Sequence, residues 1–135
     1  MVENKLTILV VEDNPAYQEL YRETLGDDYN LLAFGTKQAA FSYLEDHIPD
    51  IALVDVRLVA DQRGNEDGLE VVRRIQNLGL KTPIILKSGF PTPDVNVFAI
   101  LDKSADTQVK ELQEVVDRAA EALKVTRDVS NNQDS

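Results

Sequence analysis

Three carboxylates lie where predicted strands end, and they are the side chains in this chain best placed for chemistry. Glu12 and Asp13 directly follow the apolar run Ile8–Val11, and Asp55 nearly ends the apolar run Ile51–Val56. Like charges held together in a partly buried site repel one another, and a divalent cation with oxygen ligands would neutralise them. Magnesium suits a few carboxylates plus waters, so the pattern predicts a Mg²⁺ site at Glu12, Asp13 and Asp55.

A hydroxyl and a lysine follow two further predicted strands. Ser88 ends the strand 83–88, and Lys103 follows the strand 97–102. A metal, a lysine and a hydroxyl around a free carboxylate suit phosphoryl transfer, in which the carboxylate attacks in line and is already ionised at neutral pH. Lys87 competes for the lysine role. Successive strand side chains point to opposite faces, however, so we expect Lys87 to point away if Ser88 points in.

These side chains need a scaffold, and strands alternate with helices along the chain. Nearly continuous apolar strands separated by helices indicate a parallel sheet that is covered on both faces. Ligands bind beyond the carboxyl ends of such strands, where all the residues above lie. Tyr17 and Tyr21, on the first helix, are interpreted as packing residues. The predicted strands are 5–11, 29–34, 51–56, 83–88 and 97–102, and the predicted helices are 15–25, 36–47, 67–78 and 106–124.

Composition excludes several classes of function. The formal net charge of −10 disfavours direct binding to nucleic acid or to an anionic membrane surface. The chain has no cysteine and no apolar run long enough for a membrane span, and its first residues do not resemble a signal peptide. We therefore expect a cytoplasmic protein with one domain over residues 1–125, followed by a polar tail or the start of a linker over residues 126–135.

The ordered set of motifs resembles the receiver domain of response regulators in two-component signalling. The matching pieces are Glu12-Asp13-Asn14 after the first strand, Asp55 in LVDVRL, Asp67-Gly-Leu-Glu before the third helix, Ser88-Gly89 after the fourth strand and Asp102-Lys103 after the fifth. The resemblance covers residues 5–124. It implies a flavodoxin-like, doubly wound α/β fold with five parallel strands in the order 2-1-3-4-5.

The resemblance also implies a role for each residue. Asp55 would accept a phosphoryl group from a phosphohistidine on a histidine kinase or a phosphotransfer protein. Asp13, Asp55 and the backbone carbonyl of Arg57 would bind Mg²⁺ directly, and Glu12 would hold it through water. Ser88 and Lys103 would bind phosphoryl oxygens, and Lys103 would be the catalytic lysine. Homodimerisation is a further possibility that the family implies.

The chain departs from the family around the fourth and fifth strands. Ser104 stands where a proline usually follows the lysine, and Ile100 stands where an aromatic usually switches rotamer, with Phe98 as a possible substitute. Residues 89–96 include one glycine and two prolines, so we expect the helix between the fourth and fifth strands to be shortened or absent. The loop that follows Asp55 is longer than usual.

Two other functions stay open. A degenerate receiver could act as a phosphorylation-independent protein-interaction module. A magnesium phosphohydrolase with an aspartyl nucleophile generally carries a second carboxylate two residues after the nucleophile, where this chain has Arg57. We therefore expect no enzyme beyond a domain that catalyses its own aspartyl phosphorylation and dephosphorylation.

Overall fold

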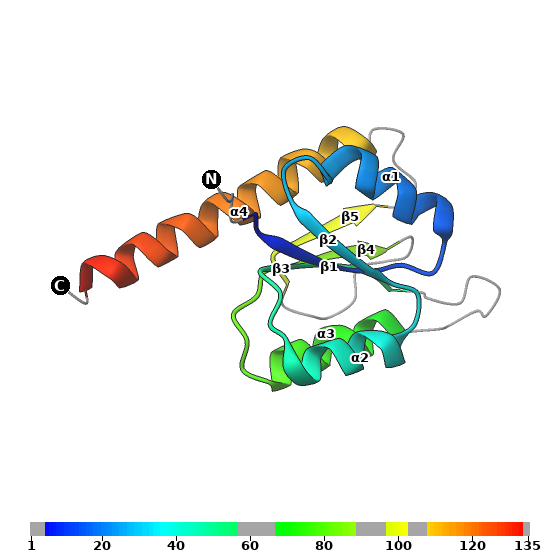
Figure 1. The fold of residues 1–135 in the computed structure, drawn as a ribbon, viewed down its shortest axis with the longest axis horizontal. Helices are drawn as coiled ribbons and strands as arrows, with labels where there is room; N and C mark the ends of the chain where they lie inside the picture. The colour runs from blue at the N-terminus through cyan, green and yellow to red at the C-terminus, as the bar shows by residue number, and fades with distance from the viewer. Residues whose placement is uncertain (1–4, 57–66, 89–96, 103–107, 134–135) are drawn as a thin grey trace.

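The computed structural model describes residues 5–56, 67–88, 97–102 and 108–133 of the chain (Figure 1). In this part of the chain there are five strands and four helices, which alternate as far as β4; β5 is the next described element and α4 follows it. The strands are β1 (Thr7–Val11), β2 (Asn30–Phe34), β3 (Ile51–Asp55), β4 (Ile84–Ser88) and β5 (Ala99–Asp102). The helices are α1 (Pro15–Leu25), α2 (Lys37–Asp46), α3 (Asp67–Asn77) and α4 (Gln108–Gln133).

All five strands are parallel and lie in the order β2-β1-β3-β4-β5. β1 pairs with β2 and β3, so the first strand lies inside the sheet, and β4 then pairs with β3 and β5. The apolar runs that predict β1 and β3 are buried on both sides, as expected for strands with helices on both faces. The predicted flavodoxin-like α/β fold and strand order are confirmed.

Two apolar cores lie on opposite faces of the sheet, as the alternation of side chains along a strand requires. One core joins Val10, Leu53 and Ile85 to apolar residues of α1 and α4, and the other joins Val11, Val54 and Leu86 to residues of α2 and α3. Figure 1 shows the same division, with α1 and α4 on one side of the sheet and α2 and α3 on the other. Each strand therefore sends alternate residues into two different environments.

Local sequence signals explain where the first two helices begin. Asn14 caps α1 by accepting a hydrogen bond from the Ala16 amide, and Pro15 follows at the first helical position. Thr36 caps α2 by accepting from the Ala39 amide. The cap at Asn14 fixes the start of α1 directly after Glu12 and Asp13.

The last helix is longer than the sequence pattern predicts. α4 continues to Gln133, past the expected end near Lys124. The sequence from Gln108 to Gln133 contains neither glycine nor proline, so no residue in it forces the helix to stop. The prediction of a domain boundary near residue 125 is a separate matter and stays a prediction.

Two further expectations concern the helices. The shortened or absent helix between β4 and β5 would fall in residues 89–96, which lie outside the described residues. Among the helices that the structure describes, none is both long enough and apolar enough to cross a membrane.

Candidate functional site

Three predicted carboxylates meet at the carboxyl ends of β1 and β3. The two strands pair with Val11 opposite Val54, which brings Glu12 and Asp13 beside Asp55 at the same edge of the sheet. Oxygen atoms of the three side chains lie within 4.8 Å of one another. The exposed fraction is only 2% for Glu12 and 3% for Asp55, whereas Asp13 is half-buried. The sequence therefore predicts correctly which carboxylates lie together.

Hydrogen bonds hold Glu12 in place from several directions. Its amide donates to the Phe34 carbonyl at 2.9 Å, and its carbonyl accepts from the Gln18 side chain at 2.6 Å. Its carboxylate accepts from the Asn14 amide at 3.2 Å and from the Tyr21 hydroxyl at 3.2 Å. The carboxylate is thus fixed between the end of β1 and the first turns of α1.

The start of α3 packs directly on the backbone of Asp55. The Gly68 amide donates to the Val56 carbonyl at 3.0 Å. A Cβ atom at Gly68 would lie 1.8 Å from the Asp55 carbonyl oxygen and 2.8 Å from the Val56 Cα. Only glycine fits such an approach, which gives the Asp67-Gly68 pair of the sequence motif a physical reason.

Ion pairs from Lys37, the first residue of α2, reach the first turn of α3. The Lys37 ammonium lies 2.6 Å from a Glu70 carboxylate oxygen and 3.5 Å from an Asp67 oxygen. These ion pairs raise the pKa of Lys37, chiefly through the hydrogen bond to Glu70. The pairs are partly exposed, so each contributes little to stability, but they link α2 to the first turn of α3.

Lys87 lies in the acidic site and does not point away from it, which we expected only if Ser88 points in; the Ser88 side chain lies outside the described residues. The Lys87 ammonium nitrogen is 3.7 Å from Glu12 Oε1 and donates a hydrogen bond to the Tyr21 hydroxyl. The reason is the pairing of β3 with β4, which places Lys87 opposite Asp55. Partners in adjacent strands point to the same side of a sheet, so the orientation that turns Asp55 toward the site also turns Lys87 toward it.

The rings of α1 cover this lysine. Its ammonium lies 4.1 Å from the centre of the Tyr17 ring and 4.8 Å from that of Tyr21, and the two rings stack with their centres 6.3 Å apart. Tyr17 and Tyr21 are therefore part of the site and not packing residues alone. The available signal was their spacing of four residues, which places both on one face of a helix.

Burial dominates the electrostatics of the site. Burial, followed by the nearby charge of Asp55, raises the pKa of Glu12 to about 7, although the positive charge of Lys87 opposes the rise. Burial and the adjacent Glu12 charge also raise the pKa of Tyr21, which keeps its hydroxyl protonated as a donor. A cation near Glu12 would lower the pKa of both Glu12 and Tyr21.

The carboxylate arrangement fits a hard divalent cation. Two buried carboxylates and one half-buried carboxylate present oxygen atoms at short mutual distance, and Mg²⁺ prefers carboxylate oxygens together with water. Glu12, Asp13 and Asp55 are the described residues that could hold it.

Several predicted site residues cannot be placed in this geometry. Arg57 and Lys103 lie outside the described residues. Ser88 and Asp102 pair at the ends of β4 and β5, but their side chains belong to the part that is not described. Ile100 lies partly buried in the core on the α2 and α3 side of the sheet.

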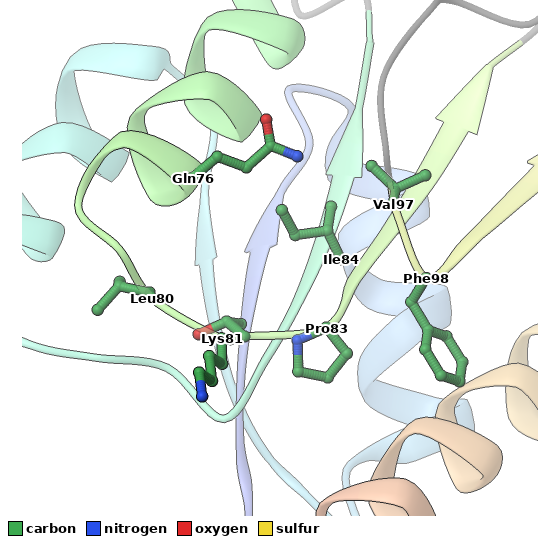
Figure 2. A pocket seen from close by; sticks show the side chains of 8 residues that line it. Gln76, Leu80, Lys81, Pro83, Ile84, Val97 and Phe98 are labelled. Atoms are coloured by element: carbon green, nitrogen blue, oxygen red, sulfur yellow. The ribbon is translucent and has the colours of Figure 1, made fainter.

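Phe98, the possible substitute for an aromatic switch, lies far from the acidic cluster along the sheet. It is 41% exposed and precedes β5. Together with Val97, Pro83 and Ile84 it lines a hollow of about 270 Å³ at the amino ends of β4 and β5 (Figure 2). The acidic cluster lies at the opposite ends of the strands, so this hollow is no part of the site.

A parallel sheet of this order defines a flavodoxin-like domain, with a candidate cation site at its carboxyl edge, and known proteins narrow the class further. The family model described as "Response regulator receiver domain" matches residues 8–124. The transcriptional regulatory protein PhoP of Escherichia coli is 35% identical over 83 residues, which cover 60% of this chain and 34% of that protein. The transcriptional regulatory protein ZraR of Salmonella typhimurium is 27% identical over 124 residues, which cover 91% of this chain and 26% of that protein.

Solved structures agree on the fold. The receiver domain of a putative LuxO repressor protein from Vibrio parahaemolyticus superposes with a TM-score of 0.77 at 20% identity, covering 93% of this chain and 97% of that one. The family match spans most of the chain, and the chain therefore belongs to the response regulator receiver domain family of two-component signalling. It spans about a third or less of the length of the curated relatives named above.

Proposed function

We propose that this chain is a phosphoacceptor receiver domain of a two-component phosphorelay. Asp55 takes a phosphoryl group from a phosphohistidine with Mg²⁺ present, and the modified domain changes its affinity for partners. The observation that carries this proposal is the convergence of Glu12, Asp13 and Asp55 oxygens within 4.8 Å at the carboxyl edge of the sheet. Membership of the receiver family supports it independently.

The residues would share the reaction as follows. A carboxylate oxygen of Asp55 forms a bond to phosphorus while the bond from phosphorus to the histidine nitrogen breaks, and the imidazole leaves with that electron pair. Mg²⁺, held by Asp13, Asp55 and the Arg57 carbonyl with Glu12 through water, would supply positive charge to the phosphoryl oxygens. Ser88 and Lys103 would bind the remaining phosphoryl oxygens.

The donor is proposed to be a histidine kinase or a phosphotransfer protein, and the domain catalyses only its own phosphorylation and dephosphorylation. A second copy of the chain is a further proposed partner. The net charge of −10 argues against direct contact of this domain with nucleic acid.

A second candidate function has one specific observation in its favour. Lys87 already places a positive charge beside Glu12, at 3.7 Å, so the acidic cluster is partly neutralised without a metal. A degenerate receiver that acts as a phosphorylation-independent interaction module would need no more than this. The complete set of three carboxylates favours the phosphoacceptor function over it.

Phosphorylation with a small donor separates the two candidates. The purified chain is treated with acetyl phosphate and Mg²⁺, and intact-protein mass spectrometry should show the addition of one phosphoryl group. Asp55→Ala should show none, and Asp50→Ala, which removes a half-buried carboxylate at the opposite end of the same strand, should be modified like the wild type. An acyl phosphate located on Asp13, or no modification with acetyl phosphate or a beryllium fluoride mimic, would reject the phosphoacceptor function.

A further inference from the structure

The buried lysine of the acidic site is the feature that the proposed function leaves unexplained. Lys87 is buried beneath the rings of α1, with an exposed fraction of 3%. The residues beside Lys87 on this face of the sheet are Ile85 on the same strand and Leu101 on β5, and both are apolar core residues. Burying an ammonium group costs free energy unless a carboxylate and hydrogen bonds compensate for the lost water, so the surroundings of Lys87 have to supply that compensation.

Three neighbouring side chains compensate the Lys87 ammonium for its lost water. Glu12 Oε1 lies 3.7 Å from the ammonium, and the Tyr21 hydroxyl both accepts from Lys87 and donates to the same Glu12 oxygen. The ring of Tyr17 presents its negative face at 4.1 Å. The lysine, a carboxylate that is a candidate metal ligand and two rings of α1 thus form one buried polar network, here called the Lys87 network (Lys87, Glu12, Tyr17 and Tyr21).

We propose that Lys87 is a tethered counter-cation of the acidic site, which neutralises Glu12 in the metal-free protein and competes with Mg²⁺ for it. The inference rests on the proposed Mg²⁺ site. Glu12 cannot attract a divalent cation at full strength while an ammonium lies 3.7 Å from its oxygen. Mg²⁺ binding would therefore loosen the contact between Lys87 and Glu12, and the two tyrosines would pass that change to α1.

A purely structural lysine would behave differently. If Lys87 served only to orient Glu12, its removal would leave the carboxylate misplaced and would weaken Mg²⁺ binding. If Lys87 competes with the metal, its removal strengthens Mg²⁺ binding. The sign of the change in Mg²⁺ affinity therefore distinguishes the two roles.

The test compares Lys87→Met with the wild type and with Lys81→Met, in which an exposed lysine that precedes β4 is replaced by the same residue. Mg²⁺ is titrated into each protein, and binding is followed by calorimetry. Lys87→Met should bind Mg²⁺ about ten-fold more tightly or better, because a like charge is removed from a site of low dielectric. Lys81→Met loses the same formal charge at the surface, where solvent and salt screen it, and should change the affinity by less than about two-fold.

Stability and fluorescence give two further readouts. In metal-free buffer Lys87→Met should melt at a lower temperature than the wild type, because two buried carboxylates lose a cation, and saturating Mg²⁺ should narrow the difference. The chain contains four tyrosines and no tryptophan, so tyrosine emission is measurable without interference. Mg²⁺ should alter that emission in the wild type, and the alteration should be smaller in Lys87→Met.

The possible results separate a failure of the inference alone from a failure of the proposed Mg²⁺ site on which it rests. Equal or weaker Mg²⁺ binding by Lys87→Met would overturn the tethered counter-cation alone. No Mg²⁺ binding by either protein would overturn the proposed metal site and the inference with it. If Lys87→Met does not fold without metal, Lys87→Gln, which keeps a polar side chain without the charge, is titrated in its place, and tighter Mg²⁺ binding than by the wild type supports the inference while equal or weaker binding overturns it.

Discussion

Gly68→Ala tests whether α3 is seated directly on the backbone of the candidate phosphoacceptor. The added Cβ would lie 1.8 Å from the Asp55 carbonyl oxygen, whereas real Cβ atoms essentially never approach another atom within 3.0 Å. The helix or the end of β3 would have to move by about 1.2 Å. Both neighbours are backbone in a buried sheet, so neither side can yield by a change of rotamer.

The size of the effect follows from two opposing contributions. Overpacking of this kind costs about 1–3 kcal/mol and sometimes more. Replacing glycine by alanine recovers about 0.4–1 kcal/mol by restricting the unfolded chain. We therefore expect a net loss of about 1–2 kcal/mol in the free energy of unfolding, or a melting temperature lower by roughly 4–7 °C for a domain of this size.

The assay is thermal and urea unfolding followed by circular dichroism, with Gly35→Ala as the matched control. A Cβ at Gly35 would meet its nearest atom, the Asp13 Cα, at 3.8 Å, which is ordinary contact at the same edge of the sheet. Gly35→Ala should therefore change the stability by no more than about 0.5 kcal/mol. If Gly68→Ala proves as stable as Gly35→Ala, the close approach of α3 to Asp55 is refuted.

Three further predictions concern the site and its supports. Mg²⁺ should raise the melting temperature of the wild type at neutral pH, and Asp13→Asn should lose most of that rise; an unchanged response would remove Asp13 from the metal site. Tyr29→Phe removes a 2.7 Å hydrogen bond to Asp117 on α4 and should cost about 1 kcal/mol in urea unfolding, whereas no loss would mean that the bond is not formed in solution. Burial raises the pKa of Glu12 from 4.5 to about 7, so the folded state holds a proton there that the unfolded state has lost. In metal-free buffer the stability of the wild type relative to Glu12→Gln should therefore fall as the pH rises between these values and level off above about 7; a rising or flat difference would contradict the shift.

Most of the fold could be predicted because every strand contains a run of three or more consecutive apolar residues. Ile8–Val11 and Ile51–Val56 predict buried parallel strands, and two carboxylates at the end of one and a third at the end of the other then have to meet at one edge of the sheet. That inference needs only the geometry of a parallel sheet, and the structure places Glu12, Asp13 and Asp55 together as expected.

What could not be predicted depends on contacts between distant segments. The orientation of Lys87 follows from its pairing with Asp55, and nothing in the local sequence of either strand specifies that register. The alternation of side chains along a strand relates Lys87 only to Ser88, its neighbour in sequence, and does not tell which of the two faces the site. The approach of Gly68 to Asp55 is equally invisible, because a glycine in a sequence does not reveal which backbone it allows to come near.

The order of the strands also decides when the charges of the site meet during protein synthesis. β1, which Glu12 directly follows, and β3, which ends in Asp55, leave the ribosome before β4, which carries Lys87. In a nascent chain that ends before β4, pairing of β1 with β3 would bring Glu12 and Asp55 together without Lys87 beside them. Their repulsion then opposes the pairing of β1 with β3, so we expect the centre of the sheet to close only when β4 adds its lysine opposite Asp55.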